Sequence, residues 1–270
     1  MKAPFWSPLP WRERIRVRGT IERMNPVAPT WHTPPDPLRL PDDEVHVWRI
    51  ELDRSDGRAR LEFLLSDDEK KRAHRFRSKT HQSRYIIGRG SLRAILARYV
   101  NQGPERLVFA YEDFGKPALS EPVSDMQFNM THSHGLALCA VSRHRRIGVD
   151  IERLRDVVDR DRIVARFFSR SEQDEYHSLP EELKREGFFR GWTRKEAYLK
   201  ALGIGISTPL DSFSVSLDPR EPALLREVVK KPEEVGRWRF ENVDATLEDV
   251  GALAVEGLDW ITRSFAFESS

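Results

Sequence analysis

The sequence has a single cysteine, Cys139, and lacks any apolar run long enough to cross a membrane. A single cysteine excludes an intramolecular disulfide and is typical of proteins in a reducing compartment. Because Cys139 lies in the apolar run 136–141, we expect its side chain to be buried. A membrane span needs about 18–20 consecutive apolar residues. The phosphate-binding pattern G-x-x-x-x-G-K-[ST] is also absent, which argues against the P-loop nucleotide hydrolases. We therefore expect a cytoplasmic protein with no membrane partner.

An excess of charge of one sign is lacking as well. The 270 residues include 45 lysines and arginines and 43 aspartates and glutamates, which gives a net charge of +2. Such a balanced composition provides no overall field that would attract nucleic acid. We therefore expect no nucleic-acid partner, and the length suffices for one large domain or two small ones.

Proline is concentrated near the N-terminus, and the remainder of the chain shows an internal repeat. Residues 1–41 contain nine of the 17 prolines, so we expect a proline-rich, loosely ordered N-terminal extension, with Met24 as an alternative start. A shift of 103 residues superposes Ser66 on Ser169 and Glu69 on Glu172, and both pairs form S-x-x-E capping boxes. This repeat predicts an N-terminal α+β half at 42–146 and a C-terminal α+β half at 147–270, which carries most of the metal ligands.

The predicted fold class is therefore α+β. We expect two similar halves related by a pseudo-two-fold axis, each with a mainly antiparallel sheet packed by helices, and a ligand cleft between them. Alternating and helical hydrophobic patterns predict strands at 45–52, 107–111, 136–142, 148–152, 213–217, 238–243 and 251–256. They predict helices at 66–77, 82–99, 157–167 and 187–202, and another helix that begins at Ser169. The tail 265–267 either pairs with a sheet edge or frays.

Two polar motifs stand out in the second half. In the strand 148–152, Asp150 and Glu152 lie on one face with Cα atoms about 7 Å apart, because side chains alternate along a strand. In the helix around 192–200, Glu196 and Lys200 lie one turn apart on the same side. Carboxylates beside a lysine suit Mg²⁺ together with a polyphosphate. Taken alone, each motif also fits a solvated sheet face or a surface salt bridge.

Together, the short motifs of this chain resemble those of the 4′-phosphopantetheinyl transferases of the Sfp type. The resemblance covers roughly residues 45–256, and several motifs in one order are more specific than any one alone. The motifs are Asn-Met-Thr-His-Ser at 129–133, Gly-Val-Asp-Ile-Glu at 148–152, Phe-Phe-Ser at 167–169 with Glu172 and Tyr176, and Trp-x-x-Lys-Glu-Ala-Tyr-x-x-Lys at 192–200. The resemblance implies transfer of the 4′-phosphopantetheine arm of coenzyme A to a serine of an apo acyl or peptidyl carrier protein, with release of adenosine 3′,5′-bisphosphate. It also implies a monomer.

The resemblance assigns the catalytic and metal-binding roles to the two motifs described above. It implies that Asp150, Glu152 and Glu196 bind Mg²⁺, with Mn²⁺ as an alternative, and that Asp150, Glu196 and Lys200 are catalytic. We expect Glu196, or a water that it holds, to accept the proton of the carrier serine. We expect Lys200 to neutralise a phosphate.

The resemblance also implies residues that bind coenzyme A. These are Thr131 and His132 beside a phosphate, the turn Gly115-Lys116-Pro117, Lys195 facing phosphate or solvent, and the cations Arg72, Lys79 and Arg84 at the 3′-phosphate. We interpret Glu69 and Glu172 as helix caps and Trp192 as a core residue that shapes the pantetheine cleft. The alternative functions are another metal-dependent phosphotransferase or nucleotide hydrolase, and a catalytically silent binding protein.

Overall fold

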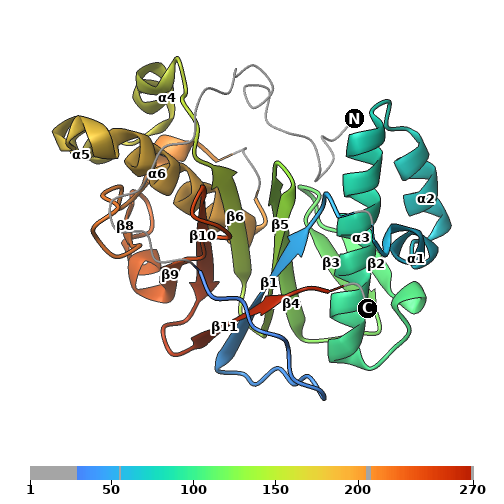
Figure 1. Cartoon of the computed structure of the whole chain (residues 1–270). Helices are drawn as coiled ribbons and strands as arrows, with labels where there is room; N and C mark the ends of the chain where they lie inside the picture. The colour runs from blue at the N-terminus through green and yellow to red at the C-terminus, as the bar shows by residue number, and fades with distance from the viewer. Residues whose placement is uncertain (1–28, 55, 205–207, 269–270) are drawn as a thin grey trace. The chain divides into compact units, whose positions relative to one another are not determined.

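The computed structural model describes residues 29–54, 56–204 and 208–268, and these residues divide into two compact units (Figure 1). The β1 unit comprises Thr30–Ala110, Pro117–His144 and the segment from Trp260 onward. The β6 unit comprises Tyr111–Lys116 and Arg145–Asp259. Both units combine helices with mainly antiparallel sheets, which confirms the predicted α+β fold class.

The β1 unit is built on a four-stranded sheet in the order β11-β1-β5-β4. Its strands are β1 (Glu44–Glu51), β4 (Met126–Ser133), β5 (Leu136–Arg143) and β11 (Ile261–Ala266). β5 pairs antiparallel with β1 and β4, whereas β11 pairs parallel with β1. The helices α1 (Arg58–Phe63) and α2 (Asp67–His74) pack on the long helix α3 (Lys79–Val100), as Figure 1 shows. After the 3₁₀ turn η2 (Pro104–Arg106), β2 (Val108–Tyr111) and β3 (Pro117–Glu121) form a small separate sheet.

The β6 unit contains a three-stranded antiparallel sheet in the order β6-β10-β9. These strands are β6 (Ile147–Arg153), β9 (Trp238–Asn242) and β10 (Asp249–Glu256). Helix α6 (Glu181–Leu202) packs on β6 and β10. The other elements are α4 (Arg160–Phe167), α5 (Arg170–Ser178), η4 (Leu210–Ser212), β7 (Phe213–Val215), β8 (Leu225–Val228) and η5 (Pro232–Arg237).

Corresponding elements recur in the two units at nearly the predicted spacing. β1, α2 and α3 match β6, α5 and α6 in order and approximate length. Both capping boxes are present: the Ser66 amide donates to Glu69 Oε2 at 3.0 Å, and the Ser169 amide donates to Glu172 Oε2 at 2.7 Å. A reciprocal cap satisfies backbone amides that the first helical turn leaves unbonded. The interpretation of Glu69 and Glu172 as caps is therefore confirmed.

The core of the β6 unit fixes the position of α6. The helix is buried at every position from Gly187 to Leu199, and it contributes the aromatic rings of Phe188, Phe189, Trp192 and Tyr198 to the core. Trp192 stacks on Phe188, and Tyr198 contacts Phe213 and Trp238. Each buried aromatic side chain removes roughly 150–250 Å² from water, so rotating α6 would expose much of this core. Trp192 is a core residue, as predicted.

The described structure differs from the sequence-based prediction at several points. Helix α6 begins at Glu181 rather than Gly187, because Pro180 starts the helix and Leu183 adds a buried contact. The short elements α1, β3 and β8 and the eight-residue strand β4 were not predicted. The C-terminal tail forms β11, which belongs to the β1 unit rather than to a half spanning 147–270. His32 bonds to Ser264 and Ala266 of this strand, so that part of the predicted loose extension is held in place.

The predictions for residues 1–28, including Met24, lie outside the described residues. None of the described helices combines the length and apolar character that a bilayer span requires.

Candidate active site

The two carboxylates of β6 face helix α6. A Cβ atom at Gly148 would lie 2.0 Å from the carbonyl oxygen of Ala197 and 2.4 Å from the amide nitrogen of Ala201, so this position lies directly against the α6 backbone. Asp150 and Glu152 lie two and four residues further along the strand and share its face, because side chains alternate. The same strand buries Ile147, Val149 and Ile151 on its other face. The alternation predicted for 148–152 therefore directs both acids toward the helix that carries Glu196 and Lys200.

Lys200 and Asp150 form the central contact of this site. Lys200 Nζ lies 2.6 Å from Asp150 Oδ1 and 3.2 Å from the carbonyl oxygen of Val149. The Asp150 side chain is 0% exposed and that of Lys200 is 24% exposed. A carboxylate with no access to water needs a positive partner, and Lys200 provides it. The structure thus brings together two of the residues that the sequence assigned to the site.

Glu152 and Glu196 are two further buried acids of the β6 unit. Glu152 accepts a hydrogen bond from Arg155 Nη1 at 3.1 Å, and both side chains of this ion pair are buried. Glu196 is also buried and lies one helical turn before Lys200 on α6. Arg155 was not predicted as part of this site, although a cation three residues after Glu152 was a signal for it.

The chemistry of these donors fits a hard divalent cation, but the described residues form no ready-made cluster of three metal-binding side chains. Asp150, Glu152 and Glu196 offer only carboxylate oxygens, which Mg²⁺ prefers. Mg²⁺ commonly takes one or two protein carboxylates and completes its shell with water and substrate phosphate oxygens. Since Asp150 and Glu152 each already have a cationic partner, the donor set suits an ion that arrives with a diphosphate.

The prediction that Lys195 faces phosphate or solvent is wrong. Its side chain is buried, and Nζ lies 2.8 Å from Glu172 Oε2, 2.6 Å from the Leu210 carbonyl oxygen and 2.7 Å from that of Phe213. An ammonium group has three hydrogens to donate, and three acceptors surround this one. Burial raises the pKa of Glu172 and lowers that of Lys195, while their mutual attraction opposes both shifts. Lys195 points away from Glu196 and Lys200 because neighbouring residues on a helix face different directions.

The turn Gly115-Lys116-Pro117 was predicted to bind a phosphate, but its lysine is bonded to the protein backbone. Gly115 has a φ of +85°, a backbone conformation that glycine adopts without strain. Lys116 is buried, and its Nζ donates to the carbonyl oxygens of Ile147, at 3.1 Å, and Ala201, at 3.4 Å. Burial lowers the pKa of Lys116 to about 8. Lys116 therefore joins the start of β6 to the end of α6, the two elements that carry the acids.

The predicted coenzyme A residues Thr131 and His132 belong to the β1 unit. They lie on β4, where Thr131 pairs with Leu138 and His132 with Ala137 of β5. Thr131 is buried and His132 is half-buried, as expected for neighbours that point to opposite faces of a sheet. Their contact with a ligand stays a prediction.

The three cations predicted at the 3′-phosphate lie on α2 and the first turns of α3. Arg84 makes two hydrogen bonds to Asp53, at 2.6 and 2.8 Å, and these bonds lower the pKa of that acid. The guanidinium of Arg72 lies 5.5 Å from the ring centre of Tyr85. Lys79 is exposed and donates to Gln82 at 3.4 Å. Within the described part of the chain, neither Arg72 nor Lys79 has an acidic partner, so these two are the stronger candidates for an anion.

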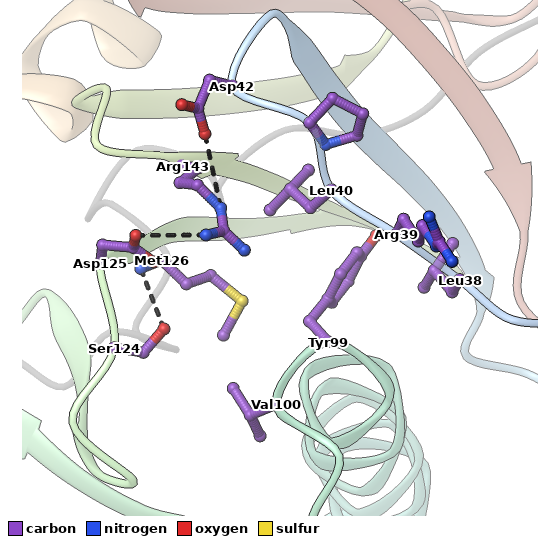
Figure 2. A pocket seen from close by; sticks show the side chains of 11 residues that line it. Leu38, Arg39, Leu40, Asp42, Tyr99, Val100, Ser124, Asp125, Met126 and Arg143 are labelled. Atoms are coloured by element: carbon purple, nitrogen blue, oxygen red, sulfur yellow. Dashed lines mark hydrogen bonds and ion pairs between the residues drawn. The ribbon is translucent and has the colours of Figure 1, made fainter.

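Two cavities of the structure contain none of the predicted catalytic residues. One, of about 460 Å³, lies in the β1 unit, where Arg143 reaches Asp125 at 3.4 Å and Asp42 at 3.6 Å beside Tyr99 and Met126 (Figure 2). The other, of about 1010 Å³, lies in the β6 unit and is lined partly by Leu199 and Leu202 of α6. Because these leucines flank Lys200 in the sequence, the second cavity begins on the helix that carries the candidate site.

Comparison with known proteins shows similarity over much of this chain. A family model described as the 4′-phosphopantetheinyl transferase superfamily matches residues 146–255, which lie in the β6 unit. The 4′-phosphopantetheinyl transferase HetI of Nostoc sp. is 42% identical over 234 residues, which are 86% of this chain and 95% of that protein. A 4′-phosphopantetheinyl transferase of Bacillus subtilis is 31% identical over 179 residues, 62% of this chain and 78% of that protein. The transferase Sfp of Bacillus subtilis strain 168 is 29% identical over 176 residues, 64% of this chain and 77% of that protein.

Proposed function

The chain belongs to the 4′-phosphopantetheinyl transferases of the Sfp type, enzymes that transfer phosphopantetheine from coenzyme A to carrier proteins, and we propose that it does so with Mg²⁺. The acceptor is a serine of an apo acyl or peptidyl carrier protein, and the second product is adenosine 3′,5′-bisphosphate. One observation carries this proposal. The buried acids Asp150 and Glu152 face the helix that presents Glu196 and Lys200.

The proposed metal ligands are Asp150 and Glu196, with Glu152 binding directly or through water. A Mg²⁺ ion held by these residues would supply positive charge to the diphosphate of coenzyme A. Burial of these carboxylates strengthens their attraction for a cation, since little water screens the charges.

The remaining chemistry belongs to side chains of the β6 unit. The serine oxygen forms a bond to the phosphorus that carries the pantetheine arm, and the bond from this phosphorus to the leaving nucleotide phosphate breaks. The serine proton passes to the Glu196 carboxylate or to a water that Glu196 holds. Lys200 neutralises the charge that develops on the phosphate oxygens.

The proposed site for the 3′-phosphate consists of Arg72 and Lys79, with Arg84 as a third cation. Thr131 and His132 bind a phosphate of coenzyme A through a hydroxyl and an imidazole, which are both directional hydrogen-bonding groups. Lys116 supports the metal site of the β6 unit, because its ammonium is bonded to the backbone of both β6 and α6.

The test incubates the protein with coenzyme A, Mg²⁺ and an apo carrier protein, and then determines the mass of the carrier by mass spectrometry. We expect the carrier to gain the mass of one phosphopantetheine arm. Nucleotide turnover with an unchanged carrier would favour another phosphotransferase or a nucleotide hydrolase, and the absence of both would favour a silent binding protein. The choice between Mg²⁺ and Mn²⁺, a monomeric state and a cytoplasmic location stay predictions.

A further inference from the structure

The candidate site holds its carboxylates in ion pairs with cations of the protein itself. Lys200 Nζ lies 2.6 Å from Asp150 Oδ1, and Arg155 Nη1 lies 3.1 Å from Glu152 Oε2. All four groups belong to the β6 unit. Lysine and arginine side chains thus supply positive charge to these two buried acids.

These two cations differ in how firmly they are held. Arg155 is buried, also donates to the carbonyl oxygen of Arg153 at 3.1 Å, and lies 5.1 Å from the ring centre of Phe189. Lys200 is partly exposed and carries its charge on a flexible four-carbon stem. A lysine of this kind can turn to another anion with little change in the surrounding structure, whereas Arg155 is fixed on several sides.

A divalent ion at Asp150 would compete with the Lys200 ammonium, which already contacts Oδ1 of this carboxylate. Both would contact the same carboxylate at bonding distance, and like charges so close together repel strongly. The part of the chain that the structure describes contains no group of three metal-binding side chains that would offset this repulsion. The metal thus binds more tightly when another anion receives Lys200.

We propose that Lys200 is a placeholder cation, which neutralises Asp150 until coenzyme A arrives and then moves to the diphosphate as the metal takes its place. This inference rests on the proposed function and extends it to the order of assembly of the site. Lys200 competes with the metal when coenzyme A is absent and ceases to compete when its phosphates are present. The metal and coenzyme A consequently bind cooperatively, and each raises the affinity of the other by the same factor.

The test measures Mn²⁺ binding to the protein alone, by electron paramagnetic resonance of the free ion. We compare the wild type with Lys200→Met and with the control Lys184→Met. Lys184 lies on the same helix but pairs with Glu181, at 2.9 Å, outside the site. Without coenzyme A, we expect Lys200→Met to bind Mn²⁺ about tenfold more tightly than the wild type, and Lys184→Met to bind it as the wild type does. Equal affinity of the wild type and Lys200→Met overturns the inference.

A second measurement needs no variant and so does not depend on how Lys200→Met folds. In the wild type, the Kd for Mn²⁺ should fall about tenfold or more when coenzyme A is added, and an unchanged Kd overturns the inference. In Lys200→Met, the same addition should have a smaller effect. Neither measurement uses a carrier protein. A failed carrier modification therefore counts against the proposed function, whereas a failed Mn²⁺ prediction counts against Lys200 as a placeholder.

Discussion

Lys195 and Glu172 form an ion pair with 2.8 Å between Nζ and Oε2, and each side chain is only 1% exposed. The lysine also bonds to Leu210 and Phe213, and the glutamate accepts hydrogen bonds from the amides of Ser169 and Val215. This pair ties α6 to the start of α5 and to the η4–β7 segment. It therefore stabilises the helix on which Glu196 and Lys200 are placed.

Removal of one partner of this pair should destabilise the fold. Lys195→Met leaves the Glu172 carboxylate buried without its cation, and such changes cost about 3–5 kcal/mol of the free energy of unfolding. Denaturant unfolding measures the loss. Arg170→Met is the control, because Arg170 and Asp174 form an exposed pair at 3.5 Å whose removal costs less than about 1 kcal/mol. Equal stability of the two variants would show that the buried pair contributes nothing.

The close approach of β6 to α6 predicts that Gly148→Ala is harmful. The added methyl would lie 2.0 Å from the Ala197 carbonyl oxygen, which belongs to helix backbone that cannot move aside cheaply. Overpacking of this kind typically lowers the free energy of unfolding by about 1–3 kcal/mol. A displaced β6 would also move Asp150 away from Lys200. Thermal unfolding and transfer assays should both show a loss. Gly236→Ala is the matched control, because a Cβ at Gly236 has no neighbour within 4 Å, and a harmless Gly148→Ala would contradict the packing described.

The buried ammonium of Lys116 predicts a specific dependence of stability on pH. Burial lowers the pKa of Lys116 from 10.5 to about 8, so between these values the unfolded chain binds more protons than the folded one. The contribution of Lys116 to the free energy of unfolding therefore rises with pH from about 8 to 10.5, by roughly 3 kcal/mol in total. Lys116→Met should abolish this rise relative to the wild type.

Chemical denaturation at several pH values between 7 and 11, on the order of half a unit apart, follows this effect. Lys231→Met is the control, since Lys231 is exposed and should leave the profile unchanged. A parallel pH profile for the wild type and Lys116→Met would refute the account of Lys116.

The cations of the β1 unit predict selective effects on coenzyme A. Arg72→Ala and Lys79→Ala should each raise the KM for coenzyme A by about tenfold, because each removes a charge that we propose meets the 3′-phosphate. Neither should change the KM for 3′-dephospho-coenzyme A. Equal effects on both substrates would show that these residues do not contact the 3′-phosphate and act on another part of the site or on folding.

The local motifs of the fold were predictable from the sequence. The two S-x-x-E boxes identified the starts of α2 and α5, because a helix cap is specified by residues three positions apart. The alternation around Asp150 correctly placed both acids of β6 on one face. The pairing of β11 with β1 was not predictable in the same way, because strand pairing across more than 200 residues leaves no local pattern.

The site residues that the sequence could not resolve are those whose partners are distant along the chain. Lys195 and Lys200 lie in the same motif and look alike in the sequence, yet one contacts Glu172 and the other Asp150. Lys116 looks like a phosphate-binding lysine in a turn, but its acceptors are carbonyl groups 31 and 85 residues away. Whether a lysine can contact a phosphate depends on such tertiary contacts, and these cannot be predicted from the spacing of residues in the sequence alone.

We propose that the acids on β6 and α6 hold the metal used in transfer. The rate of carrier modification, followed by the mass of the carrier at saturating coenzyme A and Mg²⁺, tests it most directly in Asp150→Ala and Glu196→Ala. We predict that both variants fold and that each loses transfer by about a thousandfold or more, whereas Asp174→Ala, on the exposed surface of α5, keeps the wild-type rate. Transfer at the wild-type rate by a folded Asp150→Ala or Glu196→Ala protein would contradict the account.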